Sequence, residues 1–336
     1  MTTAAPAHGT GESDRAARSR RRPGPAAGLT WLIWRQHQGA LLAGVVLLAA
    51  AIAIAAYQRA GAVAFINDHH LAGCHLADPS DPCWRDQDAL MGFASSFGAP
   101  LKFGAAACSF LPPLLVGVFL GAPLLSRDLE SGTHRLAWLQ STSRRQWLAA
   151  KLALPAAAVL FGSTLLFLVL RWWWSPSANE LSHVFWYGGT AFPGLGPVLV
   201  GYNLLSLVLG AVAGLLIRRT VPAMAVTLAS VCALLYSLSR LRPHLSSPLT
   251  MTGPGMDFSR LPGRLWPIAQ GTIDSTGATA PAASCFDASC QQQQGWVDYL
   301  PPDRFWALQG TETVICLALA AALTAFAFYW IRRRPA

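Results

Sequence analysis

The stretch that decides the fold is FGAAACSFLPPLLVGVFLGAPLL, residues 103–125, which contains no charged side chain over 23 consecutive positions. A transmembrane helix requires about 20 predominantly apolar residues, so this stretch is long enough to cross a bilayer. Working outward from it, five further runs meet the same requirement, and the six predicted spans are residues 40–57, 103–125, 152–172, 195–217, 221–238 and 311–331. The sequence therefore predicts an all-α polytopic membrane protein with about six transmembrane helices.

The bulk composition agrees with a membrane environment. Hydrophobic residues make up 53% of the 336-residue chain and charged residues only 12%, whereas about a quarter of an ordinary soluble domain is charged. The net charge of +9 is compatible with nucleic-acid binding, but the arginines lie at the ends of apolar runs rather than among base-stacking aromatic residues. We therefore expect no nucleic-acid partner.

The placement of the basic residues predicts the orientation. If the N-terminus is inside, the inner segments carry 16 of the 25 Lys and Arg residues, and the outer segments carry 12 of the 16 Asp and Glu residues. Such a bias in short loops places the basic side in the cytoplasm. Both termini and the segment 126–151 are therefore predicted to be cytoplasmic, and the two larger loops, about 58–102 and 240–308, to be extracellular. The structure of loop 240–308 is left open by the sequence.

The N-terminal 27 residues contain RAARSRRRPGP and have too few apolar residues to form a core, so we predict a disordered basic arm before a transmembrane domain of residues 28–336. A signal peptide is the alternative, because AIAA ends the first apolar run, but the polar lead is too long and further spans follow. Residues 29–38, LTWLIWRQHQ, fit a short interfacial helix or the first turns of span one.

Four cysteines fall in the predicted outer loops: Cys74, Cys83, Cys285 and Cys290. In an oxidising compartment they predict two disulfides with three possible pairings, of which we favour the two pairs within loops. The alternative is a metal site that combines Cys74 with His69, His70 and His75. We expect the disulfide outside the cell and therefore predict no metal.

The sequence lacks the motifs of an enzyme or an ion-driven carrier. No Gly-x-x-x-x-Gly-Lys-Ser/Thr phosphate loop occurs, and no paired carboxylates or Ser/His/Asp set converges on one face. Lys102, Arg171 and Glu312 lie at the ends of the predicted spans rather than at mid-membrane, where ion-coupled carriers usually place charge. We expect no cofactor and an energy source in a partner.

Two features predict how the spans bend and pack. Pro112 and Pro113, in the middle of span two, predict a helix kink, which either borders a cavity or is a simple bend. The pairs Gly117–Gly121 and Gly210–Gly214 have the spacing that lets helices approach closely. We expect this contact within one subunit, with a subunit–subunit contact as the alternative. In RRTVP, residues 218–222, Thr220 is a plausible cap for the next span.

The cytoplasmic segment RDLESGTHRLAWLQSTSRRQWLAAK, residues 127–151, predicts a helix that ends and restarts. Asp128 and Glu130 end span two, and Gly132 breaks the helix. Ser143 and Gln146 have the spacing of a capping box, which predicts a new helix leading into span three. The basic and apolar residues between them suit either a helix on the membrane surface or a surface for a soluble partner.

A family resemblance accompanies this pattern. Residues 120–151, LGAPLLSRDLESGTHRLAWLQSTSRRQWLAAK, resemble the signature of type-2 ATP-binding-cassette (ABC) transporter permeases between spans two and three. The positions that match are Glu130, Gly132, Thr133, Ser143, Arg144 and Lys151. WLIWRQHQGALL and DRFWALQGTETVICLALAAAL resemble the form common in actinobacteria, whereas the long last outer loop with its cysteines departs from the family.

The resemblance implies a function. Such permeases work as dimers, and each subunit is bound by a separate cytoplasmic ATPase. The segment 126–151 would be the coupling element, built from Asp128, Glu130, Gly132, Thr133, Arg135, Ser143, Arg144, Arg145 and Lys151. We therefore expect the permease subunit of an ATP-driven exporter, multi-pass in a bacterial plasma membrane, in contact with lipid, and paired with itself or with a related permease. A sensory or scaffold protein with a ligand-binding outer loop is the alternative, and a zinc-dependent membrane enzyme is a third candidate.

Overall fold

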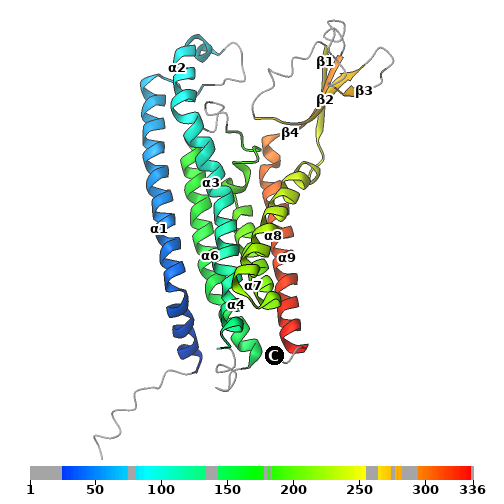
Figure 1. Ribbon diagram of the computed structural model, residues 1–336. Coiled ribbons are helices and arrows are strands. Elements are labelled where there is room, and N and C mark those ends of the chain that lie inside the picture. The colour runs from blue at the N-terminus through cyan, green and yellow to red at the C-terminus, as the bar shows by residue number, and fades with distance from the viewer. Residues whose placement is uncertain are drawn as a thin grey trace, which may run out of the picture.

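The computed structural model describes residues 25–74, 81–132, 143–177, 181, 184–254, 264–273, 277, 279–281 and 294–333. Six helical segments among them are long and apolar enough to cross a membrane, which confirms the predicted number of spans. They form an upright bundle, with a small sheet projecting beyond one end of it (Figure 1). The start of α1 and the end of α9 lie together at the opposite end, as an even number of spans requires.

Most of the spanning helices are longer than the apolar runs that predict them, whereas α7 begins three residues later than its run. Their bounds are α1 Pro25–Asp68, α2 Gln87–Phe93, α3 Ala99–Leu115, α4 Ala122–Glu130, α6 Arg144–Trp174, α7 Val198–Ile217, α8 Thr220–Leu241 and α9 Phe305–Arg333. With 44 residues, α1 is about 66 Å long, roughly twice the thickness of a hydrocarbon core. It begins inside the predicted arm and includes residues 29–38, so the structure shows the first turns of span one there and no separate interfacial helix.

Span two is assembled from several helical segments that run on without a break. The π-helical turns Ala94–Gly98 and Val116–Gly121 join α2, α3 and α4 into one rod. Pro112 and Pro113 lie inside α3, where each removes a backbone donor, and the second π-helical segment starts shortly after them at Val116. Widened turns of this kind are a common response of a helix to such local disruption. The helix therefore passes through both prolines and changes its winding beyond them.

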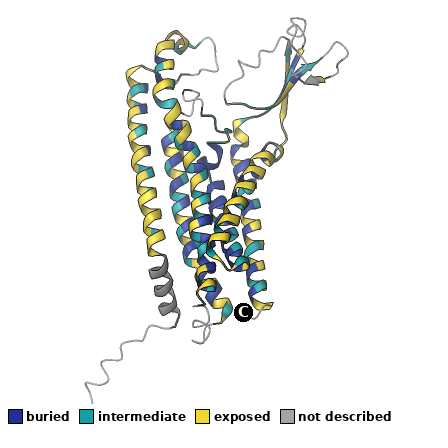
Figure 2. Cartoon of the chain, viewed as in Figure 1, coloured by how far each residue is buried: buried dark blue, intermediate teal, exposed yellow. Residues whose placement is uncertain are grey.

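The helix α7 is the centre of the bundle, and α1 lies at its edge. Of the apolar window of α7, 61% is buried, against 6% for α1. Figure 2 shows the same contrast, with exposed residues along α1 and buried residues in the middle of the bundle. Packing of α7 against α4, α8 and α9 accounts for its burial, whereas α1 packs mainly along α6.

Glycines permit the close contact between α7 and span two. A Cβ atom on Gly121 would lie 2.5 Å from the carbonyl oxygen of Leu207, and one on Gly214 would lie 2.5 Å from that of Ala122. Gly210 meets the backbone of the same region of span two, and Gly117 faces Ser206. Both glycine pairs therefore face each other within one chain, which confirms the expectation of packing inside the subunit.

The segment between α8 and α9 contains a four-stranded antiparallel sheet. The strands are β1 Leu249–Pro254, β2 Trp266–Ile273, β3 Thr279–Pro281 and β4 Gln294–Leu300, in the order β1-β4-β2-β3. Val297 of β4 stands opposite Met251 of β1 and Gln270 of β2, and its side chain is fully buried. Alternation of buried and partly exposed residues along β4 is the pattern of a strand with one covered face. The sheet is a feature that hydropathy alone does not reveal.

A disulfide lies in the segment between α1 and α2. Cys74 and Cys83 are joined, with their Cα atoms 5.9 Å apart, so the turn after α1 is fastened to the short 3-10 helix Pro82–Arg85 that precedes α2. This bond uses the thiol that the alternative metal site requires. Cys285, Cys290 and His75 lie outside the described residues, and the second disulfide stays a prediction.

Candidate functional site

The connector, residues 126–151, starts in the last two turns of α4, which ends at Glu130. Ser131 is the C-terminal cap, and its backbone N–H and hydroxyl both donate to the carbonyl oxygen of Arg127, at 3.0 and 2.8 Å. Gly132 follows with φ +72°, a left-handed conformation that glycine adopts without strain. The structure thus confirms that Gly132 breaks the helix.

The restart of the helix is also confirmed. Ser143 is the N-cap of α6, its hydroxyl accepts from the backbone N–H of Gln146, and the Gln146 side chain accepts from the backbone N–H of Ser143, both at 3.2 Å. These reciprocal bonds satisfy two donors at the helix start. Arg145 points outward on the first turn, whereas the following Trp147 and Leu148 are buried.

Trp147 and Leu148 pack this turn into a hydrophobic core that is separate from the main core of the bundle. That core also contains buried residues of α4, α7 and α9: Leu124, Leu125, Ala211, Leu215, Ala327 and Ile331. The end of the bundle that carries the connector, here called the connector end, is therefore packed as one body.

A buried ion pair joins the two helices that flank the connector. Lys151 Nζ of α6 lies 2.7 Å from Asp128 Oδ2 of α4, and both residues are buried, at 4% and 7% exposure. Neither charge is stable alone in such a place, because a buried charge without its partner retains the full penalty of leaving water. The pair therefore holds the beginning and the end of the connector at a fixed separation.

Glu130 connects the same corner to α8. Its carboxylate accepts from both the backbone N–H and the hydroxyl of Thr220, at 2.9 and 2.7 Å. The Ser126 hydroxyl lies 3.2 Å from the Thr220 hydroxyl oxygen. The N-cap residue of α8 is Arg219, so the expectation that Thr220 caps its own helix is wrong. The first turn of α8 instead receives its acceptor from α4, a partner that local sequence cannot reveal.

The connector residues predicted from the sequence therefore divide into two groups. Asp128, Glu130 and Lys151 form ties between helices, and Gly132, Ser143, Arg144 and Arg145 mark the break and the exposed restart. Thr133 and Arg135 lie outside the described residues. Thr220 belongs to the site and was missed as a contact, although its position in the tight RRTVP turn is a signal that it lies at the same membrane side.

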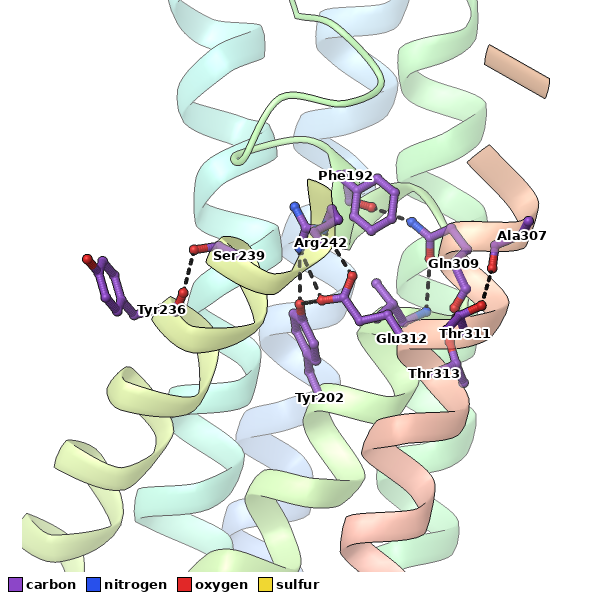
Figure 3. Close-up of polar contacts among 11 residues, drawn as sticks. Phe192, Tyr202, Tyr236, Ser239, Arg242, Ala307, Gln309, Thr311, Glu312 and Thr313 are labelled. Carbon is purple, nitrogen blue, oxygen red and sulfur yellow. Dashed lines mark hydrogen bonds and ion pairs between the residues drawn. The ribbon is translucent and has the colours of Figure 1, made fainter. Parts of the chain in front are cut away.

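A second polar cluster lies near the other end of the bundle, here called the sheet end. Figure 3 shows Arg242, directly after α8, reaching Glu312 of α9 and Tyr202 of α7. Arg242 Nε is 2.9 Å from Glu312 Oε2, and Arg242 Nη2 is 3.2 Å from Glu312 Oε1 and 3.1 Å from the Tyr202 hydroxyl oxygen. The Tyr202 hydroxyl also donates to Glu312. The guanidinium stacks on the ring of Phe192, 4.0 Å from its centroid.

Gln309 fixes α9 beside this cluster. Its Oε1 accepts from the backbone N–H of Val198, at 3.1 Å, and its Nε2 donates to the carbonyl oxygen of Phe192, at 2.7 Å. From the sequence alone, Glu312 is expected only at the end of a span. A signal for its role is that Glu312 is the single acidic residue in the apolar run 305–333, and Arg242 is available after α8 as its partner.

These features define a class of protein: a six-span helical membrane protein whose spans two and three are joined by a capped, ion-paired connector at one face. The family model of ABC-2 membrane transporter related proteins matches residues 45–242, more than half of the chain, and the chain belongs to this family. It is a membrane transport component of the ABC-2 type and not itself the ATPase of an ABC system. No curated protein and no solved structure matches the chain.

Proposed function

We propose that the chain is the permease subunit of an ATP-driven exporter and that the connector docks on a separate cytoplasmic ATPase. The observation that carries this proposal is the pair of ties at the connector: Asp128 to Lys151 and Glu130 to Thr220. Through them a force applied between Gly132 and Ser143 reaches α4, α6 and α8 together. A loop that only lay on lipid would not require such fastening.

The orientation rests on charge and on the cysteines. The connector end carries Arg127, Arg145 and the Arg218–Arg219 turn, and basic residues gather on the cytoplasmic side of membrane proteins. The Cys74–Cys83 disulfide lies between α1 and α2, and the end of α1 and the start of α2 lie at the same end of the bundle as the sheet (Figure 1). Disulfides persist in the oxidising exterior. We accordingly assign the connector end to the cytoplasm of a bacterium and the sheet end to the exterior of its plasma membrane.

The exposed apolar side chains of α1 fit lipid contact. Leu42, Val45, Val46 and Ile54 are each more than half exposed, and water would disfavour such a surface. Assembly as a homodimer, or with a related permease of the actinobacterial form, follows from the resemblance. The hydroxyl groups within the spans do not identify a substrate class. Those of Ser163, Thr164 and Thr227 donate to carbonyl oxygens of their own helices.

Co-purification tests the proposal. The chain is expressed with the ABC ATPase encoded beside it, and the amount of ATPase recovered per permease is measured. We expect Arg145→Glu to lower recovery at least about tenfold, a difference of about 1.4 kcal/mol in binding. Arg332→Glu, an exposed arginine at the end of α9, is the matched control and should change recovery less than twofold.

The sensory or scaffold function is the second candidate, and the projecting sheet is the observation that favours it. It predicts that no neighbouring ATPase binds the chain. Equal recovery with both variants, or no recovery with the unaltered chain, would reject docking and leave this candidate in its place.

A further inference from the structure

We propose that Tyr202, Arg242 and Glu312 form the closed outer gate of the permease and that α8 connects this gate to the connector. The inference rests on the proposed function for its orientation. It starts from a property of α8: a polar tie to another helix exists at each of its ends. Thr220, its first residue, bonds Glu130, and Arg242, its C-terminal cap, bonds Glu312.

The helix between these ties is suited to transmit movement. Thr220 to Leu241 is 22 residues, about 33 Å of continuous helix, and therefore spans the hydrocarbon core. Arg218 and Arg219 connect α7 to α8 along the chain in a two-residue turn, with Arg218 at φ +60°. A shift of Glu130 consequently displaces α8 along or across the bundle and pulls on Arg242 at the far end.

The gate cluster closes the sheet end because it joins three spans. Tyr202 belongs to α7, Arg242 to the end of α8 and Glu312 to α9, and Phe192 from the inserted 3-10 helix Phe192–Leu195 covers the guanidinium. All three polar residues are buried, at 1%, 3% and 0% exposure. Beyond Arg242, residues 243–248 and Ile268 line an open pocket, so the chain becomes accessible to solvent directly after the cluster.

The chemistry of the cluster also allows the three helices to part. A buried ion pair contributes little stability compared with apolar residues of the same volume, because both charges lose their water. Once the helices part, water can hydrate both charges again. The open state is therefore less disfavoured than it would be for an apolar contact, and the cluster has two acceptable arrangements.

Cys316 provides a native reporter for this gate. It lies one turn beyond Glu312 on the same face of α9, is fully buried, and has Gly201 of α7 against it. Parting α7 from α9 would expose its thiol. In cells, a membrane-impermeant maleimide is added from outside, and labelling of the Cys316 peptide is followed by mass spectrometry, so that cysteines elsewhere do not interfere.

We expect Glu312→Gln to label Cys316 at least about tenfold faster than the unaltered chain, because it removes the charge pair without changing size. Tyr202→Phe keeps the ion pair but loses the bridging hydroxyl, and we expect it to label Cys316 about threefold faster than the unaltered chain. Thr311→Val, beside Glu312 but exposed and bonded to Ala307 of its own helix, should change nothing.

The outcomes separate the gate from a structural role. Faster labelling of Cys316 with unchanged labelling of the half-buried Cys108 of α3 supports the gate. A parallel rise at Cys108, or no change at Cys316, overturns it. If Glu312→Gln does not reach the membrane, Tyr202→Phe decides by the same criteria. Because the assay involves no ATPase, its failure is distinct from a failure of docking.

Discussion

Replacing Lys151 by methionine tests the ion pair beneath the connector. Methionine keeps most of the volume but leaves the Asp128 carboxylate buried without the ammonium group that lies 2.7 Å from it. Removal of one partner of a buried pair costs about 3–5 kcal/mol, because the remaining charge loses the opposite charge that offset its loss of water. Unfolding free energies of a single domain are about 5–15 kcal/mol, so this loss is a large fraction of the total.

The magnitude is obtained from a double-mutant cycle. The free energy of unfolding in mixed micelles is measured for the unaltered chain, Lys151→Met, Asp128→Asn and the double variant. We expect each single variant to lose about 3 kcal/mol or more and the double variant to lose less than the sum of the two by at least about 2 kcal/mol. Single variants that lose less than about 1 kcal/mol, or strictly additive losses, would refute the claim that the two charges hold α4 to α6.

Three further predictions address the packing, the disulfide and the helix break. Gly210→Leu should greatly reduce the yield of folded protein in detergent, since a Cβ there would lie 2.6 Å from the backbone nitrogen of Ala122. Gly310→Leu is the control and should not reduce the yield, because a Cβ there would meet nothing within 4 Å. Similar yields of the two variants would contradict the close contact. Wild-type Cys83, the more exposed of the two bonded cysteines, should resist an impermeant maleimide until a reductant is added, and Cys74→Ser should make it reactive at once. Reaction of Cys83 in the untreated wild type would exclude the bond. Gly132→Val should lower the unfolding free energy by about 1–2 kcal/mol and Gly132→Asn by less, because asparagine tolerates a positive φ; equal losses would argue against the left-handed turn.

Local and periodic features of this fold follow from the sequence. The six spans depend on the lengths of apolar runs, the break at Gly132 on backbone sterics, and the capping box on side chains three residues apart. Each of these is decided within a few residues. The contact of the two glycine pairs comes from their spacing, which is also visible in a linear chain.

The remaining features depend on partners far away in the chain. Glu130 and Thr220 are 90 residues apart, and Arg242 and Glu312 are 70 apart, so no local pattern pairs them. The sheet also depends on distant segments, because strand β4 pairs with β1 and β2, which lie earlier in the chain. The predicted end of the first span, at residue 57, differs from the structure for another reason. The helix α1 continues past Tyr57 to Asp68, because backbone hydrogen bonding continues where hydropathy falls.

The unequal burial of α1 and α7 has a consequence for how the sequence is free to vary. Random substitution of α1 between Leu42 and Ile54 by other aliphatic side chains should be tolerated at most positions, because the surrounding medium is fluid and adapts to shape. The same exchange in α7 should prevent folding at most positions. Leu199, Leu205 and Leu207 are buried among packed side chains that cannot adapt to a different shape. Among natural variants of this chain, α7 should therefore drift slowly and α1 quickly.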